Sequence, residues 1–298
     1  MPNIAVVGSI SMDLVAVSSK RPKAGETVIG EAFHTVPGGK GANQAVAAAR
    51  LGANVAMVGA VGNDDYGKLV RNNLENEHIF IDYVVPVTDE TTGIAHIVLA
   101  EEDNSIVVVQ GANRRVNEQL VDRAKDLLIK ADMVVLQLEI PLETVKYVLA
   151  LCEEYNIPVM LNPAPAQVLS TDILEKVTYI TPNEHECRIV LDDFESPIEE
   201  LLAKYPNKLL MTEGGKGVRF HNGTEIVHVP SIFVEVVDTT GAGDTFNGAL
   251  AVALSEGEIL QKAIRFANIA GGLSVTKLGA QGGMPTREKV QEVQVIVG

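Results

Sequence analysis

The stretch "NQAVAAARLGANVAMVG", residues 43–59, indicates the fold class of this chain. Residues 43–52 are rich in Ala and end on a Gly, which is typical of a helix and its C-terminal stop. Residues 54–59 form a short apolar run without a period of two, as strands buried on both faces do. A helix followed by a buried strand is the repeating unit of an α/β fold.

The same alternation runs along most of the chain. Further short apolar runs occupy residues 4–8, 133–139, 157–162, 179–183 and 208–212. Residues 117–131 have the apolar spacing of an amphipathic helix. Strands that alternate with helices predict a mostly parallel sheet covered by helices.

Two stretches, 14–36 and 93–110, break this rhythm. Both alternate apolar and polar residues around turn signals, which favours hairpins with one solvated face. The two hairpins could pair into a small sheet that covers the main domain. Two separate peripheral hairpins fit the pattern equally well.

Composition narrows the classes of partner. The chain has 298 residues, 46% of them hydrophobic and 21% charged, with a formal net charge of −15. Such a negative field repels nucleic acid and anionic lipid, so we expect neither as a partner. An anionic small molecule is not excluded, because it responds to local dipoles and metal ions.

The sequence shows no sign of export or membrane insertion. Cys152 and Cys187 form no close-spaced motif, which argues against a disulfide framework. The first residues, "MPNIAVVGSISMD", lack a basic region followed by a long apolar stretch. No uncharged apolar run reaches the roughly 18 residues of a membrane helix. We therefore expect a soluble, cytoplasmic protein.

Polar residues collect where the predicted parallel strands end. These are Ser11 and Asp13 after the first strand, Glu139, Asn162, Asn183 with Glu186, and Thr212 followed by three glycines. Any one of them could be a capping or turn residue. Because the carboxyl ends of parallel strands meet at one edge of the sheet, the collection predicts a pocket there.

Glycine-rich loops exclude two common nucleotide motifs. "VPGGKGANQAV" (36–46) lacks the spacing of a P-loop and the Ser or Thr after its Lys. No G-x-G-x-x-G occurs, so a dehydrogenase fingerprint is absent. "TEGGKGV" (212–218) fits either a hairpin turn or a loop that lets the backbone approach a nucleotide closely.

The segment "VVDTTGAGDTFNGAL" (236–250) carries the clearest chemical signal. Small residues before a helix leave its first N–H groups open, and these form an anion site with the helix dipole. Asp244 could simply be an N-cap, but an N-cap does not require glycine on both sides of Ala242. The sharper interpretation is a catalytic base for a substrate hydroxyl, with the amides of 241–244 stabilising a transferring phosphoryl group.

Two long motifs connect these features to a known family. "GGKGANQAVAAARLGANVAMVGAVG" (38–62) and "DTTGAGDTFNGAL" (238–250) resemble the two signatures of the ribokinase (PfkB) family of sugar kinases. "LQLEIP" (136–141), "LNPAPA" (161–166) and "TPNEHE" (181–186) look like further blocks of the family, in the expected order. The resemblance covers essentially the whole chain.

The resemblance implies a fold and an activity. It implies a three-layer α/β/α domain built from residues 1–13, 37–92 and 111–298, with a small β lid from 14–36 and 93–110. It implies phosphorylation of D-ribose at its 5-hydroxyl by ATP with Mg²⁺. It also implies a homodimer in which the lids of two subunits pack together.

The resemblance further implies roles for individual residues. Asp244 matches the catalytic base and Gly241, Ala242 and Gly243 match the anion hole. The positions that match sugar contacts are Ser11, Met12, Asp13, Gly39, Lys40, Gly41, Asn43 and Glu139. Those that match nucleotide contacts are Asn183, Glu186, Thr212, Glu213, Gly214, Gly215, Lys216, Gly217, Gly243 and Asn268, with Glu186 acting on the Mg²⁺–phosphate arrangement. The positions that match a K⁺ site are Asp238, Thr240, Ser274, Lys277, Gly279 and Gly283, several of them through backbone carbonyls.

The sequence departs from the family pattern at two places. Ser11 stands where the family's ribose kinases usually carry Asn, and a hydroxyl offers fewer hydrogen bonds than an amide. Deoxyribose or another sugar or nucleoside is therefore the rival substrate. "AQGGMP" (280–285) also departs from the commoner sequence beside the predicted K⁺ site.

Two other classes of protein fit less well. A sugar or nucleotide sensor without catalysis would be favoured by loss of Asp244 or of the small-residue loop, and both are present. A zinc hydrolase is unsupported, because the six histidines show no metal-binding spacing.

Overall fold

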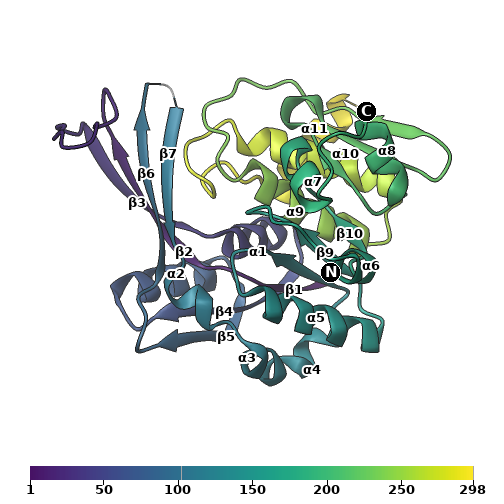
Figure 1. Cartoon of the computed structure of the whole chain (residues 1–298), viewed down its shortest axis with the longest axis horizontal. Coiled ribbons are helices and arrows are strands. Elements are labelled where there is room, and N and C mark those ends of the chain that lie inside the picture. The colour runs from purple at the N-terminus through teal and green to yellow at the C-terminus, as the bar shows by residue number, and fades with distance from the viewer. Residues whose placement is uncertain (102, 298) are drawn as a thin grey trace.

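The main body of the molecule is built on a parallel sheet (Figure 1). The computed structural model describes residues 1–101 and 103–297; residues 102 and 298, within the predicted stretches 93–110 and 111–298, lie outside it. In the described residues the six-stranded sheet has the order β10-β9-β8-β1-β4-β5, and every neighbouring pair is parallel. Its strands are β1 (Asn3–Val7), β4 (Asn54–Gly62), β5 (Phe80–Val87), β8 (Met133–Gln137), β9 (Val159–Asn162) and β10 (Tyr179–Ile180). The predicted mostly parallel sheet is thereby confirmed.

One predicted strand has a different place. Of residues 208–212, only β11 (Met211–Thr212) is a strand, and it pairs antiparallel in a separate sheet of order β11-β12-β13. The partners are β12 (Val218–His221) and β13 (Ile226–Val229). Isolated parallel bridges from Ile180 to Leu209 and from Asn183 to Thr212 still align this segment with the main sheet.

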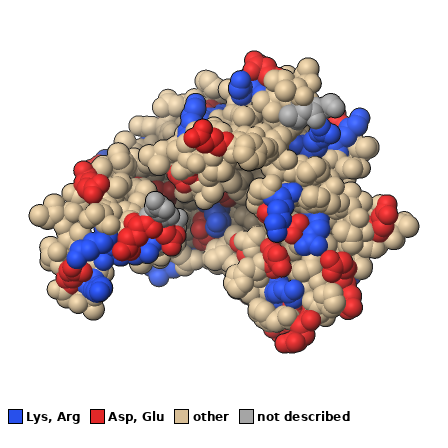
Figure 2. Space-filling view, turned by 90° about the horizontal axis from the view of Figure 1, so that it is seen from above, with Lys and Arg blue, Asp and Glu red and all other residues tan. Residues whose placement is uncertain are grey.

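The two stretches predicted as hairpins pair with each other in one four-stranded sheet. Its order is β3-β2-β6-β7, formed by β2 (Ser11–Val17), β3 (Ala32–Gly38), β6 (Gly93–Ala100) and β7 (Asp103–Val109). We call it the small sheet. Strands β2 and β6 join the two hairpins in parallel. Figure 1 shows the small sheet projecting from one side of the body, and Figure 2 shows a recess with acidic and basic side chains between the projection and the body.

Helices cover both faces of the main sheet. In β1, Ile4 and Val6 belong to one apolar cluster, whereas Ala5 and Val7 belong to another. The first cluster includes residues of α1 (Lys40–Arg50), α2 (Asp65–Asn76), α9 (Ala242–Ser255), α10 (Leu260–Ser274) and α11 (Arg287–Val297). The second includes residues of α3 (Glu118–Arg123), α4 (Lys125–Leu128), α5 (Leu142–Tyr155), α6 (Thr171–Lys176), α7 (Glu184–Val190) and α8 (Ile198–Lys204). Because successive side chains of a strand point to opposite faces, the two clusters confirm the three layers.

The helix predicted over 117–131 is wrong as a single element. The chain forms α3 and α4 instead, with Ala124 between them. The Ala124 amide donates to both the Leu120 and the Val121 carbonyls, which tightens the turn and ends the first helix.

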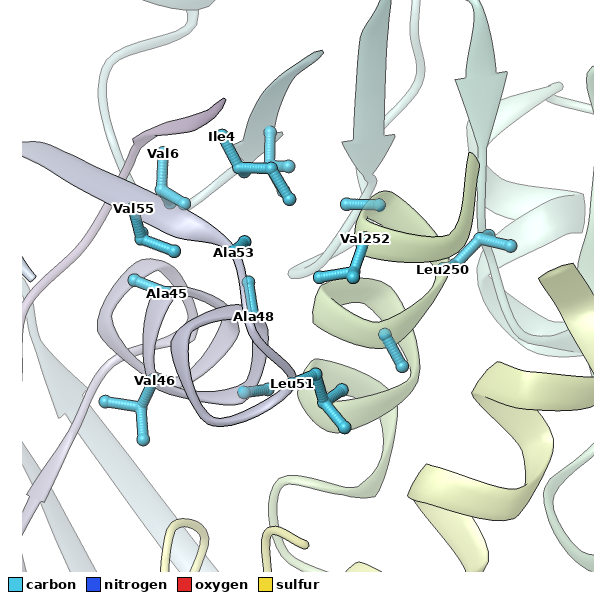
Figure 3. Close-up of a cluster of buried hydrophobic side chains, with 14 of the residues drawn as sticks. Ile4, Val6, Ala45, Val46, Ala48, Leu51, Ala53, Val55, Leu250 and Val252 are labelled. Atoms are coloured by element: carbon cyan, nitrogen blue, oxygen red, sulfur yellow. The ribbon is translucent and has the colours of Figure 1, made fainter. Parts of the chain in front are cut away.

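Helices α1 and α9 pack closely against each other and against β1, and α1 also packs against β4 (Figure 3). An added Cβ at Gly248 of α9 would lie only 2.7 Å from the Cβ of Ala47 and from the carbonyl oxygen of Gln44. Only glycine therefore permits this approach, which brings the first turn of α9 beside α1. Across the described residues, no helix is both long and apolar enough to span a bilayer.

Candidate active site

The strand order makes the carboxyl end of β1 a topological switch point, and we call the region beyond it the crevice. From β1 the chain continues to β4 on one side and later to β8 on the other, which is the reversal at which open α/β sheets bind ligands. The segments that leave this edge carry Ser9–Asp13 after β1 and Glu139 after β8. The observed topology therefore supports the location that the sequence predicted for a pocket.

Charged side chains from three regions meet here. Lys40 begins α1, Asp13 lies in β2, and Asp244 lies in α9. Burial raises the pKa of Asp13 to about 7, helped by the charges of Glu139 and Asp244 and opposed by Lys40. Burial lowers the pKa of Lys40, but the carboxylates around it, Asp244 first, outweigh burial and raise it. The crevice is thus short of positive charge and suited to a ligand rich in hydrogen-bond donors.

Glu139 is held in place by a residue that the sequence analysis missed. The Ser9 hydroxyl donates to Glu139 Oε2 at 2.5 Å, and the Lys40 amide donates to the same oxygen at 3.2 Å. The Gly41 amide in turn donates to Ser9 Oγ at 3.2 Å. Ser9 is buried and directly follows the apolar run of residues 4–8, and that position was the available signal.

The predicted glycines around Lys40 allow close backbone approach. Gly39 has a φ of 90°, and a Cβ there would lie 2.7 Å from the Ser11 amide nitrogen. At Gly41 a Cβ would lie 2.7 Å from the backbone of Ser9. The loop before α1 is therefore pressed against the segment that carries Ser11, Met12 and Asp13.

Asp244 lies in the first turn of α9, whose N-cap is Gly241 rather than Asp244 itself. Both carboxylate oxygens accept hydrogen bonds from α1: Oδ2 from Asn43 Nδ2 and Oδ1 from Gln44 Nε2, each at 3.0 Å. The side chain is 7% exposed. Its anchoring by two amides makes it a fixed acceptor in the crevice.

The amides at the start of α9 are only partly free. The Ala242 amide donates to the Thr239 carbonyl at 3.2 Å, so the expectation that it is an open donor is wrong. Within the described residues, the amides of Gly243 and Asp244 have no acceptor. A Cβ at Gly243 would meet no atom within 4 Å, which leaves this end of the helix open to an anion.

A second compartment lies on the other side of this helix start. It is a cavity of about 510 Å³. The predicted site residues that line it are Thr212, Gly214, Gly215, Gly217, Ala242, Gly243 and Asn268. The 212–218 segment joins β11 to β12 as a hairpin, which confirms the first interpretation of that loop. Its three glycines line the same cavity, and their close approach to a nucleotide stays a prediction. Asn268 Nδ2 donates to the Val229 and Pro230 carbonyls. Glu213 pairs with Arg219 instead of lining the cavity, and Lys216 is exposed.

Asn183 and Glu186 form a capping box at the start of α7. Asn183 Oδ1 accepts from the Glu186 amide and Glu186 Oε2 accepts from the Asn183 amide, both at 2.8 Å. This capping box satisfies two backbone amides at the start of the helix. Burial lowers the pKa of Lys40, and Glu186 is near enough to join Asp244 and Glu139 in outweighing burial and raising that pKa.

The residues matched to a K⁺ site form two groups. Asp238 contacts Thr240 and Gly279 in the first, and Ser274 contacts Gly283 in the second. Asp238 accepts from Thr240 and from the Gly279 amide, and these bonds outweigh burial and lower its pKa. A Cβ at Gly283 would lie 1.8 Å from the Ser274 carbonyl oxygen. Lys277 is exposed on the loop between the two groups. No three described His, Cys, Asp or Glu side chains are placed to share a metal ion.

A comparison of the sequence with models of protein families identifies a family of carbohydrate kinases. The model described as pfkB family carbohydrate kinase matches residues 1–287. The chain belongs to this family. Both long motifs, 38–62 and 238–250, lie inside the matched region.

Individual members of the pfkB family are similar over their whole length. A ribokinase of Bacillus subtilis is 57% identical over 293 residues, which is 98% of this chain and 99% of that protein. A deoxyribokinase of Salmonella typhi is 38% identical, over 97% of this chain and 98% of that protein. The structure of an Arabidopsis thaliana ribokinase complexed with ribose and ATP has a TM-score of 0.90 and 34% identity, with 98% of each chain covered.

This pfkB-family site contains buried polar residues that the motifs did not reveal. Besides Asp244, Gln44 Nε2 contacts Asn162 Oδ1, and Gln44 Oε1 accepts from Gln137. Thr181 and Asn247 continue the network, and Asn247 Nδ2 donates to the Gly243 carbonyl. Asn162 was recognised as a strand-end residue, whereas Gln44 and Gln137 look like ordinary helix and strand positions in the sequence.

Proposed function

We propose that this protein transfers the γ-phosphoryl group of ATP to the 5-hydroxyl of D-ribose, giving D-ribose 5-phosphate and ADP. The observation that carries the proposal is the position of Asp244. Its fixed carboxylate lies beside open helix amides, between the acidic crevice and the 510 Å³ cavity. The full-length similarity to ribokinases supports ribose as the acceptor.

In this proposal the crevice binds the sugar. The carboxylates of Asp13 and Glu139 accept hydrogen bonds from neighbouring sugar hydroxyls. The amide of Asn43 donates a hydrogen bond to such a hydroxyl. Lys40 and the backbone at Ser11, Met12, Gly39 and Gly41 close the site around them. Asp244 accepts the proton of the 5-hydroxyl while that oxygen bonds to the γ-phosphorus and the bond to ADP breaks.

The open amides at residues 243 and 244 stabilise the charge that develops on the transferring phosphoryl group. They point from a helix N-terminus, which adds the field of the helix dipole. Gly241, with a φ of 75°, sets the sharp turn that opens the helix, and Ala242 contributes to the cavity wall.

The 510 Å³ cavity would take the nucleotide. Its lining includes Thr212, Gly214, Gly215 and Gly217, with Asn268 on α10. Mg²⁺ in such sites is held by the phosphates and few carboxylates, and Glu186 is a single carboxylate of this kind. When bound, the ion neutralises phosphate oxygens. The Asn183 backbone amide, which donates to Glu186 Oε2, would hold this carboxylate in place.

The proposal includes a K⁺ ion at the loops of residues 238–240 and 274–283. Oxygen donors are the ligands that such an ion takes, and this region offers the Asp238 carboxylate and several carbonyls. The close approach of Gly283 to the Ser274 carbonyl supports the fit. When bound, K⁺ would orient the loop that precedes α9. We include a cytoplasmic location in the proposal, because the reaction consumes ATP.

The test is an ATP-dependent phosphorylation screen of the purified protein over pentoses, hexoses and nucleosides, with and without K⁺. We expect the highest kcat/KM with D-ribose, and a higher rate with K⁺. A clear preference for 2-deoxyribose or for another acceptor would contradict the proposed substrate.

The base is tested separately with Asp244→Asn. Turnover should fall about 10²–10⁴-fold, because general-base catalysis of this kind contributes that much. Asn43 and Gln44 both donate to residue 244, so an amide there puts one donor against another and costs some stability. Thermal unfolding checks that the variant is folded, and near-normal turnover in a folded variant would refute the assignment.

A further inference from the structure

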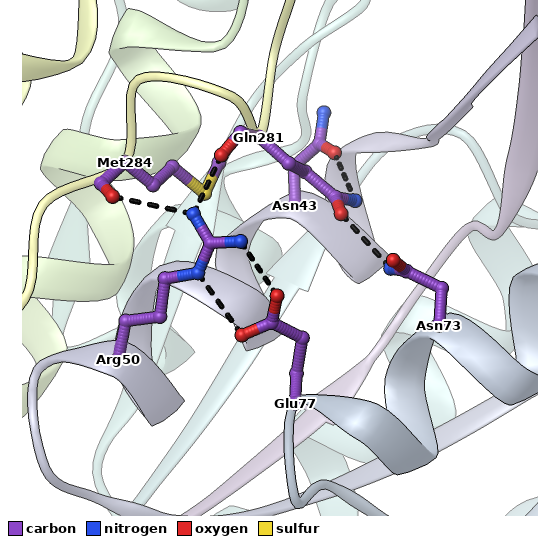
Figure 4. Close-up of polar contacts among 6 residues, drawn as sticks. All are labelled: Asn43, Arg50, Asn73, Glu77, Gln281 and Met284. Atoms are coloured by element: carbon purple, nitrogen blue, oxygen red, sulfur yellow. Dashed lines mark hydrogen bonds and ion pairs between the residues drawn. The ribbon is translucent and has the colours of Figure 1, made fainter.

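A row of side-chain amides runs from Asp244 past the loop of residues 275–286, which joins α10 to α11 and which we call the C-terminal loop. Asn43 donates to Asp244 Oδ2, Gln281 Nε2 donates to Asn43 Oδ1 at 2.9 Å, and Asn73 Nδ2 donates to Gln281 Oε1 at 2.9 Å. Figure 4 shows the outer part of this row, in which Gln281 lies between Asn43 and Asn73. The row joins α1, the C-terminal loop and α2.

The direction of each amide in the row follows from the carboxylate. Ionised Asp244 can only accept, so Asn43 must present its NH₂ group to it. The Asn43 oxygen then faces Gln281, which must donate in turn. Asn43 is 5% exposed and Gln281 is 6% exposed, so bulk water is a poor substitute for a missing partner.

The backbone of Gln281 is fixed independently of its side chain. Arg50 NH1 donates to the Gln281 carbonyl at 2.6 Å and to the Met284 carbonyl at 3.2 Å. The Arg50 guanidinium is paired with both carboxylate oxygens of Glu77 (Figure 4). Asn43 and Arg50 are two helical turns apart on α1, so one face of this helix holds the loop at two points.

We propose that Gln281 is a positioning residue for the sugar-side machinery. It keeps the Asn43 amide turned with its NH₂ group toward Asp244 and thereby keeps both oriented toward the acceptor hydroxyl. The inference rests on the proposed function of Asp244 and Asn43. Without the Gln281 donor, the Asn43 oxygen loses its buried partner, and a turned amide would bring that oxygen against the Asp244 carboxylate.

The main experiment is a double-mutant cycle with Gln281→Met and Asn43→Ala in the full-length protein, with ATP and D-ribose as substrates. Met keeps the size of Gln and removes its amide. We expect Gln281→Met to lower kcat/KM for ribose about 10–100-fold, the usual effect of an unpaired buried group. KM for ATP should stay within about twofold, because the row does not reach the nucleotide cavity.

The coupling is read in the Asn43→Ala background. There Gln281→Met should change kcat/KM by less than about twofold, because its target amide is already gone. Gln291→Met, the same substitution at an exposed position of α11, is the matched control and should behave as the wild type. Thermal unfolding of all variants separates loss of fold from loss of positioning.

A second variant covers the case in which Gln281→Met does not fold. Asn73→Ser withdraws the outer donor and leaves Gln281 in place, and we expect a smaller loss that also disappears in the Asn43→Ala background. If the wild type is active but the losses in kcat/KM of the single variants add up in the double variants, the role of Gln281 is overturned and the proposed function is not. A wild-type protein that phosphorylates no sugar would overturn the proposed function and, with it, this role of Gln281.

Discussion

Ser11 is the residue at which substrate preference is most open to test. It is 9% exposed and begins β2, where it pairs with Gly38 and Gly93. Ser11→Asn should raise the ratio of ribose to 2-deoxyribose turnover by several-fold, because an amide offers both a donor and an acceptor to the additional hydroxyl. The measurement is kcat/KM for both sugars under identical conditions. An unchanged ratio would remove Ser11 from the specificity determinants.

Asp13 gives a pH-dependent prediction for stability. Its pKa is raised to about 7 by burial and by Glu139 and Asp244, despite Lys40. The folded protein therefore binds a proton that the unfolded chain has lost, so this residue lowers stability as the pH rises from about 4 to about 7. Asp13→Asn should raise the Tm of the ligand-free protein by roughly 5 °C at pH 8.

The same substitution should have little effect on Tm at pH 4, where the wild-type carboxyl is already neutral. Thermal unfolding of both proteins across the pH range, without sugar, provides the comparison. A Tm difference that does not depend on pH would show that the charge of Asp13 is not its cause. Ribose affinity of Asp13→Asn should fall, since a carboxylate that can accept from hydroxyls is lost.

Single residues also show where sequence reasoning stops. Asp244, Lys40 and Asn43 stood out because they match positions to which the family's motifs give a role. Ser9, Gln44 and Gln281 did not, because their importance comes from partners far along the chain: Glu139 for Ser9, Asp244 for Gln44 and Asn43 for Gln281. Such pairings exist only after the sheet has brought the segments together.

At the scale of elements, the contact between α1 and α9 controls the site. Gly248→Ala should destabilise the protein by about 1–3 kcal/mol despite the better helix propensity of Ala, because its Cβ would meet the α1 backbone. It should also lower kcat, since Asp244 lies one turn before Gly248 and depends on Gln44 of α1. Denaturant unfolding and steady-state kinetics measure both effects.

Gly271→Ala is the matched control for stability. It is also inside a helix, but its added Cβ would come no closer than 3.4 Å to another atom. We expect it to be neutral or slightly stabilising. Equal destabilisation by both substitutions would argue against a special role for the α1–α9 approach.

The elements themselves were predicted unevenly. The buried runs around β1, β4, β8 and β9 were recognised because strands covered on both faces have uniformly apolar sequences. The break at Ala124 was not, because Ala is a strong helix former and no local signal marks the turn. The pairing of the small sheet was left open, since alternation shows which residues face solvent but not which strand lies alongside.

At the scale of the molecule, the small sheet leaves apolar residues in solvent. Ile106, Val107, Val108 and Val109 of the edge strand β7 are each at least 45% exposed, and Phe33 of β3 is 61% exposed. An edge of this kind invites pairing with another chain. The homodimer that the family resemblance implies stays a prediction, and these exposed residues support the small sheet as its interface.

Val107→Lys should therefore shift the protein from dimer to monomer. Analytical ultracentrifugation over a range of concentrations measures the change, and Leu69→Lys, at an exposed apolar position on α2, serves as the control. A wild type that is monomeric at every concentration, or a Val107→Lys variant that is still dimeric, would contradict the proposed interface.

One strand limits how this protein can change during evolution. Every residue of β2, from Ser11 to Val17, is paired with β3 on one side and β6 on the other. A one-residue slip would break both ladders and turn each side chain to the opposite face. Adaptation to a new acceptor is therefore confined to exchanging side chains on a backbone that stays where it is, so descendants with other preferences should superimpose closely along this strand.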